Sequence, residues 1–189
     1  MARGDTRGPR DFYSGRLNER DALGDFKRTP AFMRAYRAAA NERGYVNYRQ
    51  SMDLVERHYE GDPTNPTKPL ANELRMAVID ELELETDADM DRIKFYTAVG
   101  TPLDHFHGVD AWIEFVPDVG PPRRVTIDVT LNPSKETHKA DVIIQEVPDP
   151  SENEAKFMKL VYDKYAPQLA DKLRPAVNMM MRRRTRKAS

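Results

Sequence analysis

The sequence predicts an α/β domain in which a mixed sheet of about four strands is flanked by helices, with a helical extension before it. Two neighbouring segments, 108–115 and 125–131, alternate apolar and polar residues, which is the period of a half-buried strand. A further segment at 141–147 contains the apolar run Val142-Ile143-Ile144, and helix-forming segments lie on either side of these strands. Strands interspersed with helices predict a sheet covered on its faces by helices.

The first third of the chain is predicted to be helical after an extended start. Residues 1–16 contain four arginines and three glycines without periodicity, so we expect an extended arm. Thr29 and Pro30 predict the start of a helix that runs to about Arg43, because proline suits the first helical position. A second helix is predicted over about 48–59. Proline and threonine then recur in 61–69, which predicts a linker.

The core is predicted to follow this linker. We expect a helix over about 68–83 and a strand over 92–99, and then the hairpin. The apolar run 141–147 predicts a strand in the interior of the sheet. The predicted organisation is thus a basic arm with a helical extension over 1–60, an α/β core over 67–166 and a basic helical tail over 167–189.

Sequence signals near the C-terminus predict several separate helices. Ser151 and Glu154 have the spacing of a capping box, which predicts a helix to about Tyr165. Pro167 and Pro175 then predict breaks, because proline removes a backbone donor from a helix interior.

Composition excludes some classes of protein. The chain has 189 residues and no cysteine, which excludes disulfides and thiolate metal sites. No apolar run approaches the roughly 20 residues that a membrane-spanning helix needs, and the first residues lack an apolar signal segment. We therefore expect a cytoplasmic protein without a membrane partner.

The charges are unevenly distributed, although the net charge is only −1. Residues 61–166 carry 11 basic against 21 acidic side chains, whereas 167–189 carry 7 against 1. An acidic centre fits cation binding, and a basic tail fits contact with phosphates. The candidate phosphate-binding side chains are Arg182, Arg183, Arg184, Arg186 and Lys187; the alternative is a solvated, disordered end.

Two aspartates on the predicted hairpin are the strongest candidate site. Centring the turn near Val119 places Asp110 opposite Asp128 and Glu114 opposite Arg124. Aspartate is disfavoured in strands, and two neighbouring carboxylates repel each other unless a cation lies between them. The alternative is an ordinary hairpin with a solvated polar face.

The hairpin resembles the core of the PD-(D/E)XK nuclease superfamily, which has the restriction-endonuclease-like fold. The resemblance covers roughly 67–147 and lies in Gly-Val-Asp-x-x-Ile at 108–113 and Ile-Asp-Val-Thr at 127–130. It implies Asp110 and Asp128 as catalytic metal ligands, with the Val129 carbonyl beside them and Glu73 as a helical acid. It also implies Mg²⁺ or Mn²⁺ as cofactor and nucleic acid, DNA or RNA, as partner.

The sequence departs from the family pattern at one position, where Thr130 stands in place of a lysine. Lys135, Lys139 and Lys94 are the candidate replacements. We favour Lys135, since the Asn132-Pro133 turn can direct it back over the site; the alternative is a surface lysine. The expected function is therefore a metal-dependent phosphodiesterase acting on nucleic acid. The alternative is a catalytically inactive nuclease-fold protein that binds nucleic acid or forms part of an oligomer or larger assembly.

Other candidate residues lie beside the aspartates. On a strand, His105 and His107 would share a face and could bind zinc, with Asp104 or Asp110 as the third ligand. Alternatively, His107 is an accessory acid/base or a loop histidine. Trp112 is either a base-stacking residue or a core residue packed beneath a helix.

Overall fold

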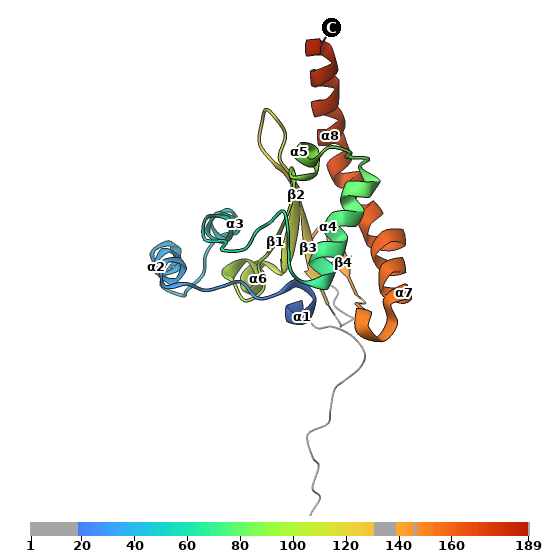
Figure 1. Ribbon diagram of the computed structural model, residues 1–189. Coiled ribbons are helices and arrows are strands. Elements are labelled where there is room, and N and C mark those ends of the chain that lie inside the picture. The colour runs from blue at the N-terminus through green and yellow to red at the C-terminus, as the bar shows by residue number, and fades with distance from the viewer. Residues whose placement is uncertain (1–18, 131–138, 146, 189) are drawn as a thin grey trace, which may run out of the picture.

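The computed structural model describes residues 19–130, 139–145 and 147–188. A four-stranded sheet in the order β1-β2-β3-β4 lies at the centre of this part of the chain, with helices on both faces (Figure 1). β2 pairs antiparallel with β1 and β3, whereas β4 pairs parallel with β3. The predicted α/β class with a mixed sheet of about four strands is confirmed. The strands are β1 (Ile93–Thr97), β2 (Ala111–Phe115), β3 (Arg123–Val129) and β4 (Val142–Ile144).

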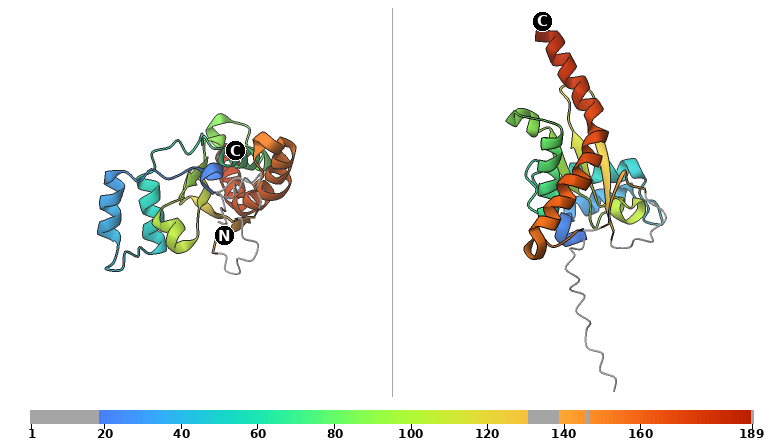
Figure 2. Two further views of the ribbon diagram at one scale, coloured as in Figure 1. Left: turned by 90° about the horizontal axis from the view of Figure 1, so that it is seen from below. Right: turned by 90° about the vertical axis from the view of Figure 1, so that its right-hand side faces the viewer.

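One face of the sheet carries the larger apolar core. Ala111, Ile113 and Phe115 of β2 point into it, and so do alternate residues of β3 and β4. The helices that cover this face include the orange-to-red ones from the C-terminal part of the chain, which are seen in Figure 2. They are α1 (Glu19–Leu23), α4 (Pro69–Glu81), α7 (Pro150–Leu160), the π-helical turn η1 (Val161–Tyr165) and α8 (Ala166–Ala188). None of the helices in the described residues combines the length and apolar character that a membrane crossing needs.

The opposite face is covered by helices from the first half of the chain. Tyr96 of β1 and Trp112 of β2 lie on this face and pack in a second apolar cluster with Phe32 and Val55. The helices here are α2 (Pro30–Ala39), α3 (Tyr48–Arg57) and α6 (Pro102–His107), and a short α5 (Asp87–Met90) precedes β1. The predicted helices over 30–43 and 48–59 are therefore present, although α2 ends at Ala39.

The hairpin has the predicted register. Glu114 pairs with Arg124 and Ala111 with Ile127, and the turn spans 116–122. The Arg124 guanidinium donates to the Glu114 carboxylate at 2.8 Å, and it also pairs with Glu56 of α3. This ion-pair network ties α3 to the hairpin. The alternating pattern of the two segments thus predicted both the pairing and its register.

Three predictions about the second half of the chain are wrong. β4 is an edge strand in the described sheet, and its apolar character comes from Val142 and Ile144, which pack into the larger core. The N-cap of α7 is Asp149, which accepts from the Ser151 N–H, and no Ser151–Glu154 capping box forms there. α8 continues through Pro175, because its apolar residues pack along the sheet and α4. The predicted arm over 1–16 lies outside the described residues.

Candidate functional site

Asp110 and Asp128 meet at the end of the hairpin that lies away from its turn. Asp110 directly precedes β2, whose last pair with β3 is Ala111–Ile127, and the charge of Asp128 on β3 acts on its carboxyl. Both are buried, with exposed fractions of 3% and 2%. The Asp110 N–H donates to the Ile127 carbonyl, and the Ala98 N–H donates to the Asp110 carbonyl, so neighbouring strands on both sides hold this residue.

The Asp110 carboxyl has an unfavourable environment for its charged form. Its Oδ2 accepts the Val129 N–H at 2.7 Å, which stabilises the charge. Burial has the larger opposite effect, and the negative charges of Glu19, Asp104 and Asp128 add to it, so the pKa of Asp110 rises to about 8. A bound divalent cation would reverse this balance by stabilising the carboxylate.

One of these acids, Glu19, was missed in the sequence, whereas Asp104 was named there as a possible zinc ligand. Glu19 is the first residue of α1, and Asp104 lies in the first turn of α6, where it accepts the Gly100 N–H at 2.7 Å. The signal for α6 was present, since Thr101 caps the helix and Pro102 occupies its first position. No comparable local signal places Glu19 beside Asp110, because tertiary packing brings α1 there.

The structure does not bring Glu73 to the two aspartates. Glu73 lies on α4, which packs on the face of the sheet that carries Ala111, and its charge acts on Tyr162 of η1. Within residues 19–130, 139–145 and 147–188, no three histidine or acidic side chains group closely enough to hold a metal ion. The Val129 carbonyl as a metal ligand stays a prediction, since the contact that the structure shows for Val129 is made by its N–H.

The candidate replacements for the family lysine have different positions. Thr130 is buried and continues the ladder, with its N–H donating to Ile144. Lys94 pairs in register with Glu114, four residues along β2 from Asp110, or roughly 13 Å at the usual rise per strand residue. Lys139 donates to the Phe106 carbonyl of α6 at 3.4 Å. Lys135 lies outside the described residues.

The predicted geometry of the two histidines is wrong, because they lie on a helix. His107 is buried, with its Nε2 2.9 Å from the Val46 carbonyl, whereas His105 is exposed. They therefore do not share the face that a zinc pair requires. Base stacking by Trp112 is also contradicted, because its ring is fully buried and stacks on Tyr96 with centroids 4.7 Å apart.

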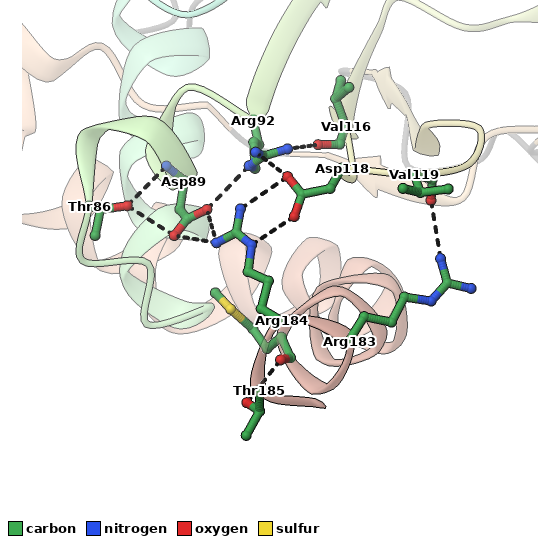
Figure 3. Close-up of polar contacts among 10 residues, drawn as sticks. Thr86, Asp89, Arg92, Val116, Asp118, Val119, Arg183, Arg184 and Thr185 are labelled. Carbon is green, nitrogen blue, oxygen red and sulfur yellow. Dashed lines mark hydrogen bonds and ion pairs between the residues drawn. The ribbon is translucent and has the colours of Figure 1, made fainter. Parts of the chain in front are cut away.

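The C-terminal basic residues lie at the other end of the hairpin. They form the last turns of α8, beside the β2–β3 turn (Figures 1 and 3). Arg184 donates from Nε and Nη2 to the Asp118 carboxylate at 2.7 and 3.1 Å, and from Nη1 to Asp89 at 2.8 Å. Arg183 donates to the Val119 carbonyl at 3.4 Å. These residues are helical. The turn lies about nine strand residues, or roughly 30 Å, from Asp110, so the basic residues beside the turn cannot reach a phosphate held at Asp110.

A groove of about 340 Å³ lies next to the aspartates instead. It runs between α2 and α6, and its lining includes Arg20, Arg28, Tyr36, Asp104 and Phe106. Asp104 is one of the acids whose charge acts on Asp110, and Arg20 follows Glu19, which is another. Of the two arginines in the groove, Arg20 also pairs with Asp25 at 3.2 Å, so an anionic ligand would share it with that carboxylate.

No protein-family model matches the chain, and neither the curated proteins nor the solved structures provide a match.

Proposed function

We propose that the chain is a metal-dependent phosphodiesterase that acts on nucleic acid. The observation that supports this most is the position of Asp110, which is buried beside Asp128 and has only acids among the charges that act most strongly on it. The resemblance of the hairpin to the PD-(D/E)XK nucleases points to the same two residues. The finer assignment, a restriction-endonuclease-like fold, is part of this proposal.

The donor set fits Mg²⁺ or Mn²⁺. Mg²⁺ is commonly held by one or two carboxylates, with water and substrate phosphate completing its shell. Asp110 and Asp128 supply two carboxylates of this kind at the end of the sheet. When bound there, the cation would lower the pKa of a coordinated water and polarise the phosphate.

The remaining roles fall to side chains around the pair. Val129 orients the Asp110 carboxylate through its N–H, and burial of Asp128 excludes bulk water from it. Arg20 and Arg28 in the neighbouring groove would bind phosphates that flank the scissile one. In hydrolysis, water oxygen bonds to phosphorus and the bond to the leaving sugar oxygen breaks. Lys135 would stabilise the charge that develops on the non-bridging oxygens.

A second candidate is a catalytically inactive protein with the same fold. Thr130 occupies the position of the family lysine, Lys94 lies roughly 13 Å along the strand from Asp110, and Lys139 donates to the Phe106 carbonyl. In this case the site would retain nucleic acid without cleaving it, or the chain would serve in a larger assembly.

Cleavage of labelled single- and double-stranded DNA and RNA with Mg²⁺ or Mn²⁺ tests these alternatives. We expect turnover by the wild type, and a loss of roughly 10²–10³-fold in both Asp110→Asn and Asp128→Asn, since a preorganised electrostatic group contributes about that much. Lys156→Gln, an exposed change on α7, is the control.

Thr130→Lys separates the two candidates. Activity that appears only in this variant would assign the natural protein to the inactive class. Absence of cleavage by every variant, together with Mn²⁺ binding that Asp110→Asn leaves unchanged in calorimetry, would contradict the proposed metal site.

A further inference from the structure

A larger groove lies at the turn end of the hairpin, away from the aspartates. It measures about 850 Å³ and runs between the β2–β3 turn and the C-terminal half of α8. Val119 and Met179 face it with 63% and 55% of their surfaces exposed, which is unusual for large apolar side chains. Other apolar residues in the lining are Pro117, Pro121, Pro122, Ala176 and Met180.

Polar contacts join the two walls of this groove. Figure 3 shows Arg184 of α8 between Asp118 of the turn and Asp89 of α5, and Arg183 reaching the Val119 carbonyl. Arg92 donates to the Val116 carbonyl and pairs with Asp118 from the strand side. The groove is therefore largely formed before a ligand arrives, which reduces the ordering cost of binding.

The rim of the groove is positively charged. Arg123, Arg183, Arg186 and Lys187 belong to its lining together with Arg184. Asp118 is the only acidic residue in that lining, and it is already paired with Arg184 and Arg92. A ligand that fits this surface must combine apolar groups for the floor with negative charges for the rim.

Nucleic acid and a second copy of the chain each fit this groove less well than such a ligand. Nucleic acid would satisfy the cations, but bases stack on aromatic rings, and the lining of this groove has none. A second copy docked about a two-fold axis would place the same patch on both sides, so the cations of one copy would face those of the other. Neither occupant meets both requirements.

We propose that this groove is the docking site for an acidic segment of a partner protein. Apolar side chains of the segment would pack between Val119 and Met179, and its carboxylates would pair with Arg183, Arg186 and Lys187. Methionine suits such a surface because its side chain adapts to different apolar shapes. This inference does not depend on catalysis, because the groove lies at the opposite end of the hairpin from the aspartates.

Fluorescence polarisation with designed peptides and the full chain tests the proposal. The probe is a labelled amphipathic peptide with leucine at helical i, i+3, i+4 and i+7 spacing and glutamate elsewhere. The same peptide with lysine in place of glutamate is the charge control. A labelled single-stranded oligonucleotide tests binding of nucleic acid. We expect binding of the glutamate peptide only, weaker by at least about fivefold when salt is raised from about 0.05 to 0.3 M.

Two double variants separate the apolar and charged contributions. We expect Val119→Ser with Met179→Ser, and separately Arg183→Gln with Arg186→Gln, to weaken binding by roughly tenfold each. Two control variants change comparable exposed side chains elsewhere: Met76→Ser on α4, and the double variant Arg34→Gln with Arg37→Gln on α2. We expect neither control to alter binding of the peptide. Thermal melts check that all variants fold.

Three results would overturn the proposal. Absent binding, or equal binding of the glutamate and lysine peptides, would remove the charge complementarity. Oligonucleotide binding that depends on Met179 would assign the groove to nucleic acid. Sedimentation that shows a dimer dissolved by the Val119 and Met179 changes would assign it to a second copy.

Discussion

The two ends of the β2–β3 hairpin both carry aspartates, buried at the strand end and exposed at the turn, and their charges are treated in opposite ways. At the strand end, Asp110 is surrounded by Glu19, Asp104 and Asp128, and its pKa rises to about 8 through burial and repulsion. At the turn end, hydrogen bonds from Arg184 hold the pKa of Asp118 below its ordinary value. The Asp118 carboxylate is therefore paired with cations, whereas the charges that act most strongly on Asp110 are acidic.

Asp89 makes the comparison sharper, because it is buried almost as deeply as Asp110. Their exposed fractions are 6% and 3%. Burial raises the pKa of Asp89 as well, but hydrogen bonds from Arg184, Thr86 and Arg92 outweigh it and leave this pKa below its ordinary value. Neighbouring arginines thus lower the pKa of Asp89, whereas burial and acidic neighbours raise that of Asp110.

The largest expected effect is stabilisation by Asp110→Asn. The amide oxygen can still accept the Val129 N–H, while the buried charge is removed. We expect the free energy of unfolding at pH 7–8, measured in chelator, to rise by on the order of 2–4 kcal/mol. The melting temperature should rise by at least about 5 °C. Asp89→Asn is the matched control, and we expect it to lower the melting temperature.

The pH dependence gives an independent check of the same effect. Because the folded pKa of Asp110 is raised, the folded state binds more protons than the unfolded state between about pH 4 and 8. Stability from this group is therefore fully present near pH 4 and is lost as pH rises towards 8. The difference in free energy of unfolding between Asp110→Asn and the wild type should grow as pH rises over this range. A difference that stays constant would contradict the raised pKa.

Divalent cations should have the next largest effect, and only at the strand end. Mn²⁺ at about 100 times its dissociation constant should stabilise the wild type by roughly 2.7 kcal/mol. It should also flatten the fall in stability above pH 6, since it competes with the proton on Asp110. Thermal melts with and without Mn²⁺ measure this. Asp110→Asn should lose most of the gain, and Asp118→Asn should keep it.

Removing the Arg184 guanidinium from the turn end should destabilise the protein. We expect Arg184→Gln to reduce the free energy of unfolding by about 1–2 kcal/mol, because Asp89 loses one charged donor but keeps Thr86 and Arg92. Urea denaturation measures this change. Arg182→Gln, on the same helix and exposed, is the control, and equal effects of the two changes would argue against the Arg184 contacts.

The smallest effect is expected for Asp118→Asn. This side chain is exposed, so water screens its pairing with Arg184 and Arg92. The melting temperature should change by less than about 2 °C at low salt, and the change should vanish near 1 M salt. A large loss that persists in salt would show that the turn end depends on Asp118 more than its exposure indicates.

The hairpin was predictable because its signals are local. Alternation in 108–115 and 125–131 and the turn formers between them set the Glu114–Arg124 register, which the structure confirms. That register also placed Asp110 opposite Asp128 before any tertiary information. A period-two pattern leaves little freedom, because a slip of one residue would turn the apolar side chains away from the core.

Other features depended on contacts between distant segments. α8 passes through Pro175 because Leu173 and Val177 on either side are buried against the core. Glu19 joins the strand end through the packing of α1, which no spacing in the sequence reveals. α6 itself was missed, although Thr101, Pro102 and Gly108 are ordinary helix start and stop signals.

The burial of Trp112 gives the strand end an optical reporter. Trp112 is the only tryptophan in the sequence, and it follows Asp110 by two residues. Its indole is fully buried against Tyr96, and its Nε1 has no hydrogen-bond partner among the described residues. Emission from such an apolar site should be blue-shifted and shielded from iodide quenching. Any cation or strand of nucleic acid that disturbs this end of the sheet should therefore alter the intrinsic fluorescence without a label.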